Sequence, residues 1–120
     1  TVVEEMKEML VKATSKNGTG REARVPGYTV AGKTGTTRKI ENGKYSTNKY
    51  IASFVGFAPS ENPRFIAAIR VDEPKKNKTG GKVAAPIFSK IAASALRDFQ
   101  MSPNPKDQII PKTAMSYSSE

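Results

Sequence analysis

Apolar residues recur at helical spacing near the start of the chain and again after its middle. In residues 2–14 they lie three or four positions apart, which predicts an amphipathic helix. Asn17-Gly18 is expected to stop this helix, because both residues tolerate a left-handed backbone. Residues 84–99 carry a wider apolar stripe with Pro86 in the first turn, which predicts a second helix suited to lying across a sheet.

The residues between the two predicted helices favour β structure. Runs rich in β-branched and aromatic residues predict strands around 28–38, 49–57 and 64–72, separated by turns at 41–44 and 59–63. The second and third strands are largely apolar on both faces, so we expect them inside a sheet that is covered on both sides. Two helices can cover only one of those sides.

The sequence divides into a structured part and a tail. Residues 1–100 carry all the periodic patterns, whereas residues 101–120 are rich in Ser, Pro, Asn and Lys without a period, so the tail is expected to be disordered or a linker. The helical spacing begins at Val2 without a starting Met, which suggests a piece of a longer chain. No run is long and apolar enough to span a membrane, and any targeting segment would be upstream.

Composition narrows the chemistry. The 120 residues include no Cys and no His, which excludes His- or Cys-centred catalysis and leaves too few soft ligands for a zinc site. The net charge of +9 would suit an anionic partner. RNA binding is disfavoured because Phe54 and Phe57, three apart on a strand, face opposite ways and make a poor stacking platform. We interpret the lysines around 75–82 as a solvated surface.

The most informative motif is Lys33-Thr34-Gly35-Thr36, which lies in a predicted strand. The strand period places Lys33 and Gly35 on one face and both hydroxyls on the other, side by side. Gly35 lets a substrate backbone approach closely. A cation, two hydroxyls and a glycine without a side chain can together bind a carboxylate and stabilise a developing oxyanion. The Lys-Thr-Gly signature is typical of serine enzymes that act on D-alanyl peptides and β-lactams.

A phosphate-binding loop is an alternative interpretation, because Gly27 to Thr34 has two glycines four apart followed by Lys-Thr. The carboxylates of Asp72-Glu73 follow a later strand and would complete such a site. The loop needs a buried strand before it and a helix directly after the Lys-Thr, and neither is predicted here. A second Lys-Thr-Gly, at residues 78–80, has no strand before it and is interpreted as chance.

From Gly27 to Phe99 the chain resembles class B penicillin-binding proteins, the monofunctional D,D-transpeptidases that cross-link peptidoglycan, and it is most similar to the septal, cell-division type. The resemblance rests on Val25 to Tyr28, Val30 to Thr36, Asn48 to Pro59, Asn62 to Phe65, Val71 to Pro74, Gly80-Gly81 and Ala84 to Phe88. It implies an α/β (α+β) penicillin-binding/β-lactamase-like transpeptidase fold, with an antiparallel sheet flanked by helices. Only the C-terminal part of that domain is covered.

The resemblance also implies roles for the motif. Lys33 would position a serine and set a positive potential, the hydroxyls of Thr34 and Thr36 would hold a carboxylate beside Gly35, and the Thr36 N–H would be an oxyanion donor. Lys33 and Thr36 are thus the expected catalytic residues, and all four are expected to bind substrate. No metal or organic cofactor is implied.

The implied partners are peptidoglycan stem peptides, β-lactam antibiotics, the remainder of the transpeptidase domain and division-machinery membrane proteins, with no nucleic acid. The implied location is the extracytoplasmic (periplasmic) face of the cell membrane, with an anchor absent from this chain. A serine β-lactamase-like hydrolase is a nearer alternative, separated by how fast an acyl-enzyme turns over.

The nucleophile motif, Ser-x-x-Lys, should open a helix so that the lysine lies one turn from the serine. Ser46-Thr47-Asn48-Lys49 has these letters but leads into a strand, and Ser15-Lys16-Asn17 mimics the middle Ser-x-Asn motif but closes a helix. We therefore expect the nucleophile and middle motif upstream or in a companion chain. One departure is Asn77-Lys78-Thr79, where the family often has aromatic residues, so the shape of the acyl-side pocket stays open.

Overall fold

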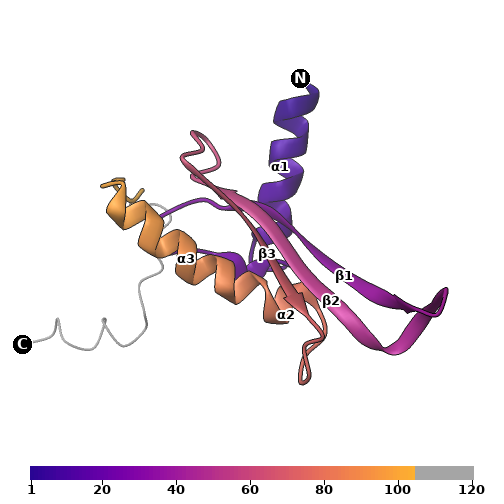
Figure 1. Cartoon of the computed structure of the whole chain (residues 1–120). Helices are drawn as coiled ribbons and strands as arrows, with labels where there is room; N and C mark the ends of the chain where they lie inside the picture. The colour runs from indigo at the N-terminus through magenta and orange to yellow at the C-terminus, as the bar shows by residue number, and fades with distance from the viewer. Residues whose placement is uncertain (105–120) are drawn as a thin grey trace, which may run out of the picture.

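The computed structural model describes residues 1–104 and confirms the predicted order of helix, three strands and helix. Two short helical segments are added, one after the first helix and one before the last. The elements, drawn in Figure 1, are α1 (Val2–Thr14), the 3-10 helix η1 (Arg21–Ala23), β1 (Ala31–Glu41), β2 (Lys44–Ala58), β3 (Phe65–Asp72), α2 (Gly80–Val83) and α3 (Ala85–Asp98).

Both ends of α1 are capped by hydroxyl side chains. Thr1 and Glu4 form a reciprocal capping box at its start. Ser15 is the C-cap residue and its hydroxyl donates to the Lys12 carbonyl at 2.6 Å, so the capping role expected for Ser15 is confirmed. The Thr14 hydroxyl donates to the Val30 carbonyl at 2.6 Å, which ties the end of the helix to the segment just before β1.

The three strands form one antiparallel sheet in the order β1-β2-β3. Asn42 and Gly43 both have positive φ, as a two-residue hairpin turn requires, so β1 and β2 continue up to the turn on either side of it. The predicted strands were therefore misplaced at this end: β1 runs to Glu41 instead of 38, and β2 begins at Lys44 instead of 49.

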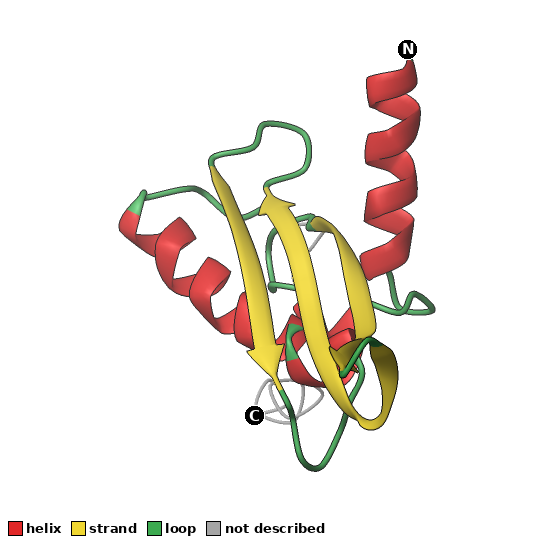
Figure 2. Cartoon of the chain, turned by 45° about the vertical axis from the view of Figure 1, so that its right-hand side comes forward, coloured by secondary structure: helices red, strands yellow, loops and turns green. Residues whose placement is uncertain are grey.

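The core lies between α3 and one face of the sheet (Figure 2). Phe54 of β2 is fully buried, with its ring centroid 4.9 Å from that of Phe88 on α3. Phe65 of β3 adds a second ring contact to Phe88 at 6.0 Å. The stripe on α3 therefore packs as predicted, with Phe88, Ala92 and Leu96 turned inward.

The other face of the sheet is open in the part of the chain described. Val55 of β2 is 48% exposed and Ile66 of β3 is 72% exposed, although burial on both faces was expected. The reason is that α3 covers the Phe54 face, while α1 packs chiefly along β1, beside the sheet in Figure 2. No described element forms a second layer over Val55 and Ile66.

The first residues of the predicted tail are packed. The Tyr28 hydroxyl donates to the Met101 carbonyl, and the Asn104 N–H donates to the Gly27 carbonyl at 2.7 Å. Residues 101–104 thus contact the segment before β1, whereas residues 105–120 lie outside the described residues, so the disordered tail stays a prediction. Within residues 1–104, none of the helices has the length and apolar character needed to cross a membrane.

Candidate active site

The motif residues lie on β1 and alternate between its faces as predicted. Lys33 is opposite Val55 of β2, on the open face of the sheet. Thr34 is opposite Phe54, on the face that α3 covers further along the sheet. The Lys33 side chain is exposed, and its Nζ donates to the Thr34 carbonyl at 2.9 Å. The lysine and the threonine hydroxyls are therefore separated by the strand itself.

The two hydroxyls share an open cleft of about 290 Å³ at the β1 side of the sheet. Thr34 and Thr36 line it, whereas Lys33 and Gly35 do not. Its other lining residues come from the loop after α1, from η1 and from the α2 region: Thr19, Arg21, Glu22, Thr79, Gly81 and Lys82. The structure thus brings together two of the four predicted residues and six others, of which the sequence analysis had connected only Thr79 with the pocket.

Hydrogen bonds hold the hydroxyls of Thr34 and Thr36 in place. The Thr34 hydroxyl donates to the Thr19 hydroxyl at 3.2 Å, and the Gly80 N–H donates to the Thr36 hydroxyl at 3.2 Å. A Cβ built on Gly80 would lie 2.1 Å from the Ser53 carbonyl oxygen and 2.6 Å from the Gly35 carbonyl oxygen. Only a glycine lets α2 approach β1 this closely, so Gly80 sets the position of the cleft wall.

Gly35 lies directly opposite Ser53 of β2. A Cβ there would meet the Ser53 hydroxyl oxygen at 2.4 Å on the neighbouring strand. Rotation of the Ser53 side chain would relieve this contact, so packing against β2 does not by itself require a glycine here. That Gly35 makes room for a substrate stays a prediction, as do the binding and catalytic roles of Lys33, Thr34 and Thr36.

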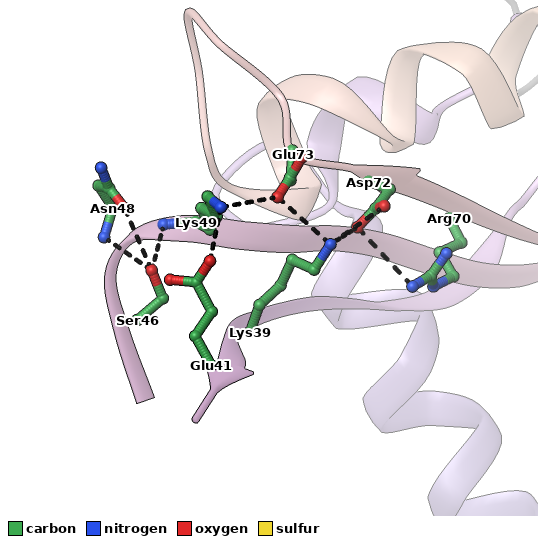
Figure 3. A network of polar contacts seen from close by, with 8 residues as sticks. All are labelled: Lys39, Glu41, Ser46, Asn48, Lys49, Arg70, Asp72 and Glu73. Atoms are coloured by element: carbon green, nitrogen blue, oxygen red, sulfur yellow. Dashed lines mark hydrogen bonds and ion pairs between the residues drawn. The ribbon is translucent and has the colours of Figure 1, made fainter. Parts of the chain in front are cut away.

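Ser46 lies in strand β2, at the place where its pairing with β1 is irregular. Its hydroxyl oxygen accepts from the backbone N–H groups of Asn48 and Lys49, at 3.4 and 3.1 Å (Figure 3). The Lys49 ammonium pairs instead with Glu41, which lowers the pKa of the Glu41 carboxyl and raises that of Lys49, mainly through their hydrogen bond. The lysine is thus engaged elsewhere, which supports a structural role for Ser46.

A second ion cluster lies beside this pair and joins β1 to the end of β3 (Figure 3). The Lys39 ammonium is 3.1 Å from Asp72 and 3.3 Å from Glu73. The hydrogen bond to Asp72 is the main cause that raises the pKa of Lys39. The cluster therefore ties the half of the hairpin nearer its turn to the end of β3, and it includes none of the four motif residues.

The structure also decides between the motif interpretations. Lys33 and Thr34 lie within β1, which runs on to Glu41 with no helix after them, so the phosphate-binding alternative lacks the helix N-terminus that it requires. In the second Lys-Thr-Gly, Lys78 lies over the Tyr50 ring at 4.9 Å. Thr79 lines the cleft. These residues are not on a strand, as expected, and Lys78 and Gly80 are not among the residues that line the cleft.

Comparison with known proteins gives consistent results. The family model described as penicillin binding protein transpeptidase domain matches residues 1–93. A probable peptidoglycan D,D-transpeptidase of Neisseria meningitidis is 46% identical over 100 residues, which cover 82% of this chain and 17% of that protein. The stage V sporulation protein D of Bacillus subtilis is 47% identical over 93 residues, which cover 77% of this chain and 14% of that protein.

Solved structures agree with the fold. The apo transpeptidase domain of Burkholderia pseudomallei penicillin-binding protein 3 is 45% identical with a TM-score of 0.74, over 82% of this chain and 30% of that one. Penicillin-binding protein 3 of Mycobacterium tuberculosis, solved with ampicillin, is 35% identical with a TM-score of 0.75, over 83% of this chain and 24% of that one. The chain thus spans about a quarter or less of most of these relatives, and it belongs to the penicillin-binding protein transpeptidase family.

Proposed function

We propose that this chain is the carboxylate-binding part of a serine D,D-transpeptidase that cross-links peptidoglycan and is acylated by β-lactams. The observation that carries the proposal is the division of β1 between two faces. Thr34 and Thr36 line one cleft, while Lys33 leaves the same strand on the opposite, open face. One strand can thus hold a substrate carboxylate on one side and present a cation to a serine supplied from the other.

The proposed reaction is acyl transfer through a serine ester. The serine attacks the carbonyl of the donor stem peptide, the terminal D-Ala leaves, and an amine of a neighbouring stem attacks the ester. The Thr36 N–H is proposed as an oxyanion donor, a contribution that is worth on the order of 3 kcal/mol in well-studied cases. Neither Ser46 nor Ser15 is assigned as the nucleophile, because Ser46 lies in strand β2 and Ser15 caps α1.

The setting of the enzyme is part of the proposal. Peptidoglycan stem peptides lie outside the cytoplasm, so we place the reaction on the extracytoplasmic face of the membrane, with an anchor outside this chain and membrane proteins of the division machinery as partners. No cofactor is required by the proposed chemistry. A hydrolase that destroys β-lactams shares the same first step, and it would differ in releasing its acyl group quickly.

The test is covalent labelling of the protein that contains these residues together with its upstream segment. We expect one adduct per molecule with a fluorescent penicillin, mapped by mass spectrometry to a serine upstream of Thr1. Persistence of the adduct for many minutes would favour a transpeptidase over a hydrolase. An unlabelled protein, or stabilisation by a nucleotide without labelling, would contradict the proposal.

A further inference from the structure

The cleft that holds the threonine hydroxyls has its own positive charge. Two of its lining residues are cations, Arg21 of η1 and Lys82 of α2, and one is an anion, Glu22 of η1. The motif lysine is not among them, since Lys33 is on the other side of the strand. The charge that a ligand meets in this cleft is therefore set by residues outside the Lys-Thr-Gly motif.

The two cleft cations are not equivalent. The Lys82 ammonium is 3.1 Å from a Glu22 carboxylate oxygen, so its charge is largely compensated. The Arg21 side chain is exposed and forms no ion pair with any residue in the part of the chain that the structure describes. Arg21 is thus the uncompensated charge of the cleft, and its guanidinium can donate two parallel hydrogen bonds to a carboxylate.

We propose that Arg21 is a specificity-determining residue that binds the carboxylate of the acyl donor, together with the hydroxyls of Thr34 and Thr36. The Glu22–Lys82 pair tunes this subsite, because its carboxylate lowers the positive potential that Arg21 and Lys82 would otherwise create. This inference rests on the proposed function. It assigns the recognition of negative charge to η1 and α2 and leaves Lys33 to the serine side of the strand.

The test compares two forms of one ligand, a penicillin with its free carboxylate and the methyl ester of the same penicillin. Rate constants for acylation are measured by intact mass spectrometry on the protein with its upstream segment. We expect Arg21→Ala to slow acylation by the free acid by about fivefold and to leave the ester unchanged. Arg21→Lys should recover part of the loss, and Glu22→Gln should raise the rate with the free acid.

Arg97→Ala is the matched control, since it removes the same charge from an exposed side chain of α3 that does not line the cleft. It should not change either rate. Added salt should slow the free acid more in the wild type than in Arg21→Ala, which gives a second readout if the ester reacts too slowly to measure.

The possible failures are distinguishable. If Arg21→Ala slows acylation by the acid and by the ester equally, the role of Arg21 is structural. If the rate and its salt dependence are both unchanged, Arg21 does not contact the ligand. Either result overturns the inference while the proposed function stands. A wild type that reacts with neither ligand overturns the proposed function and the inference with it.

Discussion

Phe54 and Val55 are neighbours on β2, yet Phe54 is fully buried whereas Val55 is 48% exposed. The difference comes from the two faces of the sheet. One face packs against α3, and the other carries Val55, Ile66 and Lys33 with no described layer over it. Apolar character alone therefore does not bury a strand residue, because burial also requires a second layer on the same side.

The polar groups of the Lys-Thr-Gly-Thr motif are also divided between these two faces of the sheet. The face turned toward η1 and α2 carries the hydroxyls of Thr34 and Thr36 in a cleft with fixed hydrogen bonds. The open face carries Lys33 among apolar side chains. The cleft is formed by described residues of this chain, whereas no described element forms a second layer over the open face.

The largest expected effect concerns the open face as a whole. We expect residues 1–120 alone to associate or remain partly unfolded, because Ile66, Val55 and the apolar side of α1 are left in water. Isolated chain should show poor NMR dispersion and no penicillin adduct, and the upstream segment should restore both. A compact monomer that melts cooperatively would contradict the prediction that the isolated chain does not fold stably. A penicillin adduct on one of its own serines would contradict the prediction that the nucleophile lies outside this chain.

The two faces can next be compared by single substitutions in the longer protein. Phe54→Ala removes a ring that contacts Phe88 and should lower the unfolding free energy by about 3–5 kcal/mol. Val55→Thr probes the other face. If the upstream segment buries Val55, this substitution should lower the unfolding free energy by more than about 1 kcal/mol. Thermal melts measure both. A Val55 variant as stable as the wild type would mean that the open face stays in water.

Lys33 tests the chemical role of the open face. Lys33→Ala should slow acylation by penicillin at least about tenfold, because a cation and its hydrogen bonds to the serine side are lost together. Ser46→Ala is the control and should label normally, since the hydrogen bonds of the Ser46 hydroxyl are with Asn48 and the Lys49 N–H on its own strand. Near-normal labelling of the Lys33 variant would remove that residue from the mechanism.

Thr34 tests the cleft face. Thr34→Val keeps the β-branched shape but loses the hydroxyl that meets Thr19, so acylation should fall by about three- to tenfold. Stability should change by less than about 1 kcal/mol. A large drop in Tm with normal acylation of the folded fraction would show that Thr34 is structural.

The smallest effect is expected at the ion pair of Glu41 and Lys49, which is exposed and belongs to neither side of the site. The pKa of Glu41 is lower in the folded protein than the ordinary carboxyl pKa of 4.5. Its contribution to stability is therefore fully present above pH 4.5 and is lost as the pH falls through the pKa of the folded state. Glu41→Gln should therefore reduce Tm by no more than about 2 °C at neutral pH, and this difference should vanish in acid. A Tm difference between the wild type and Glu41→Gln that grows in acid would show that ionised Glu41 does not stabilise the fold through Lys49.

Much of the fold could be predicted because its signals are local. The spacing in residues 2–14 and 84–99, the strand residues around Phe54 and the turn at Asn42-Gly43 each depend on a few neighbours along the chain. The alternation of Lys33 and Thr34 follows from strand geometry alone. Strand ends were less well predicted, because pairing across the hairpin extended β1 and β2 to the turn where side-chain pattern gave no reason to continue them.

The sequence by itself determined the element order, the two-sided placement of the motif residues and the exclusion of Ser46 as a helix-opening nucleophile. Only the tertiary structure decided which face of the sheet is covered, that Thr79 and Gly80 approach β1, and that Arg21 and Lys82 join the threonine cleft. These residues are far apart along the chain, and a local pattern carries no information about contacts between distant segments. Their meeting depends on α3 packing across the sheet, which brings α2 and η1 to the edge of β1.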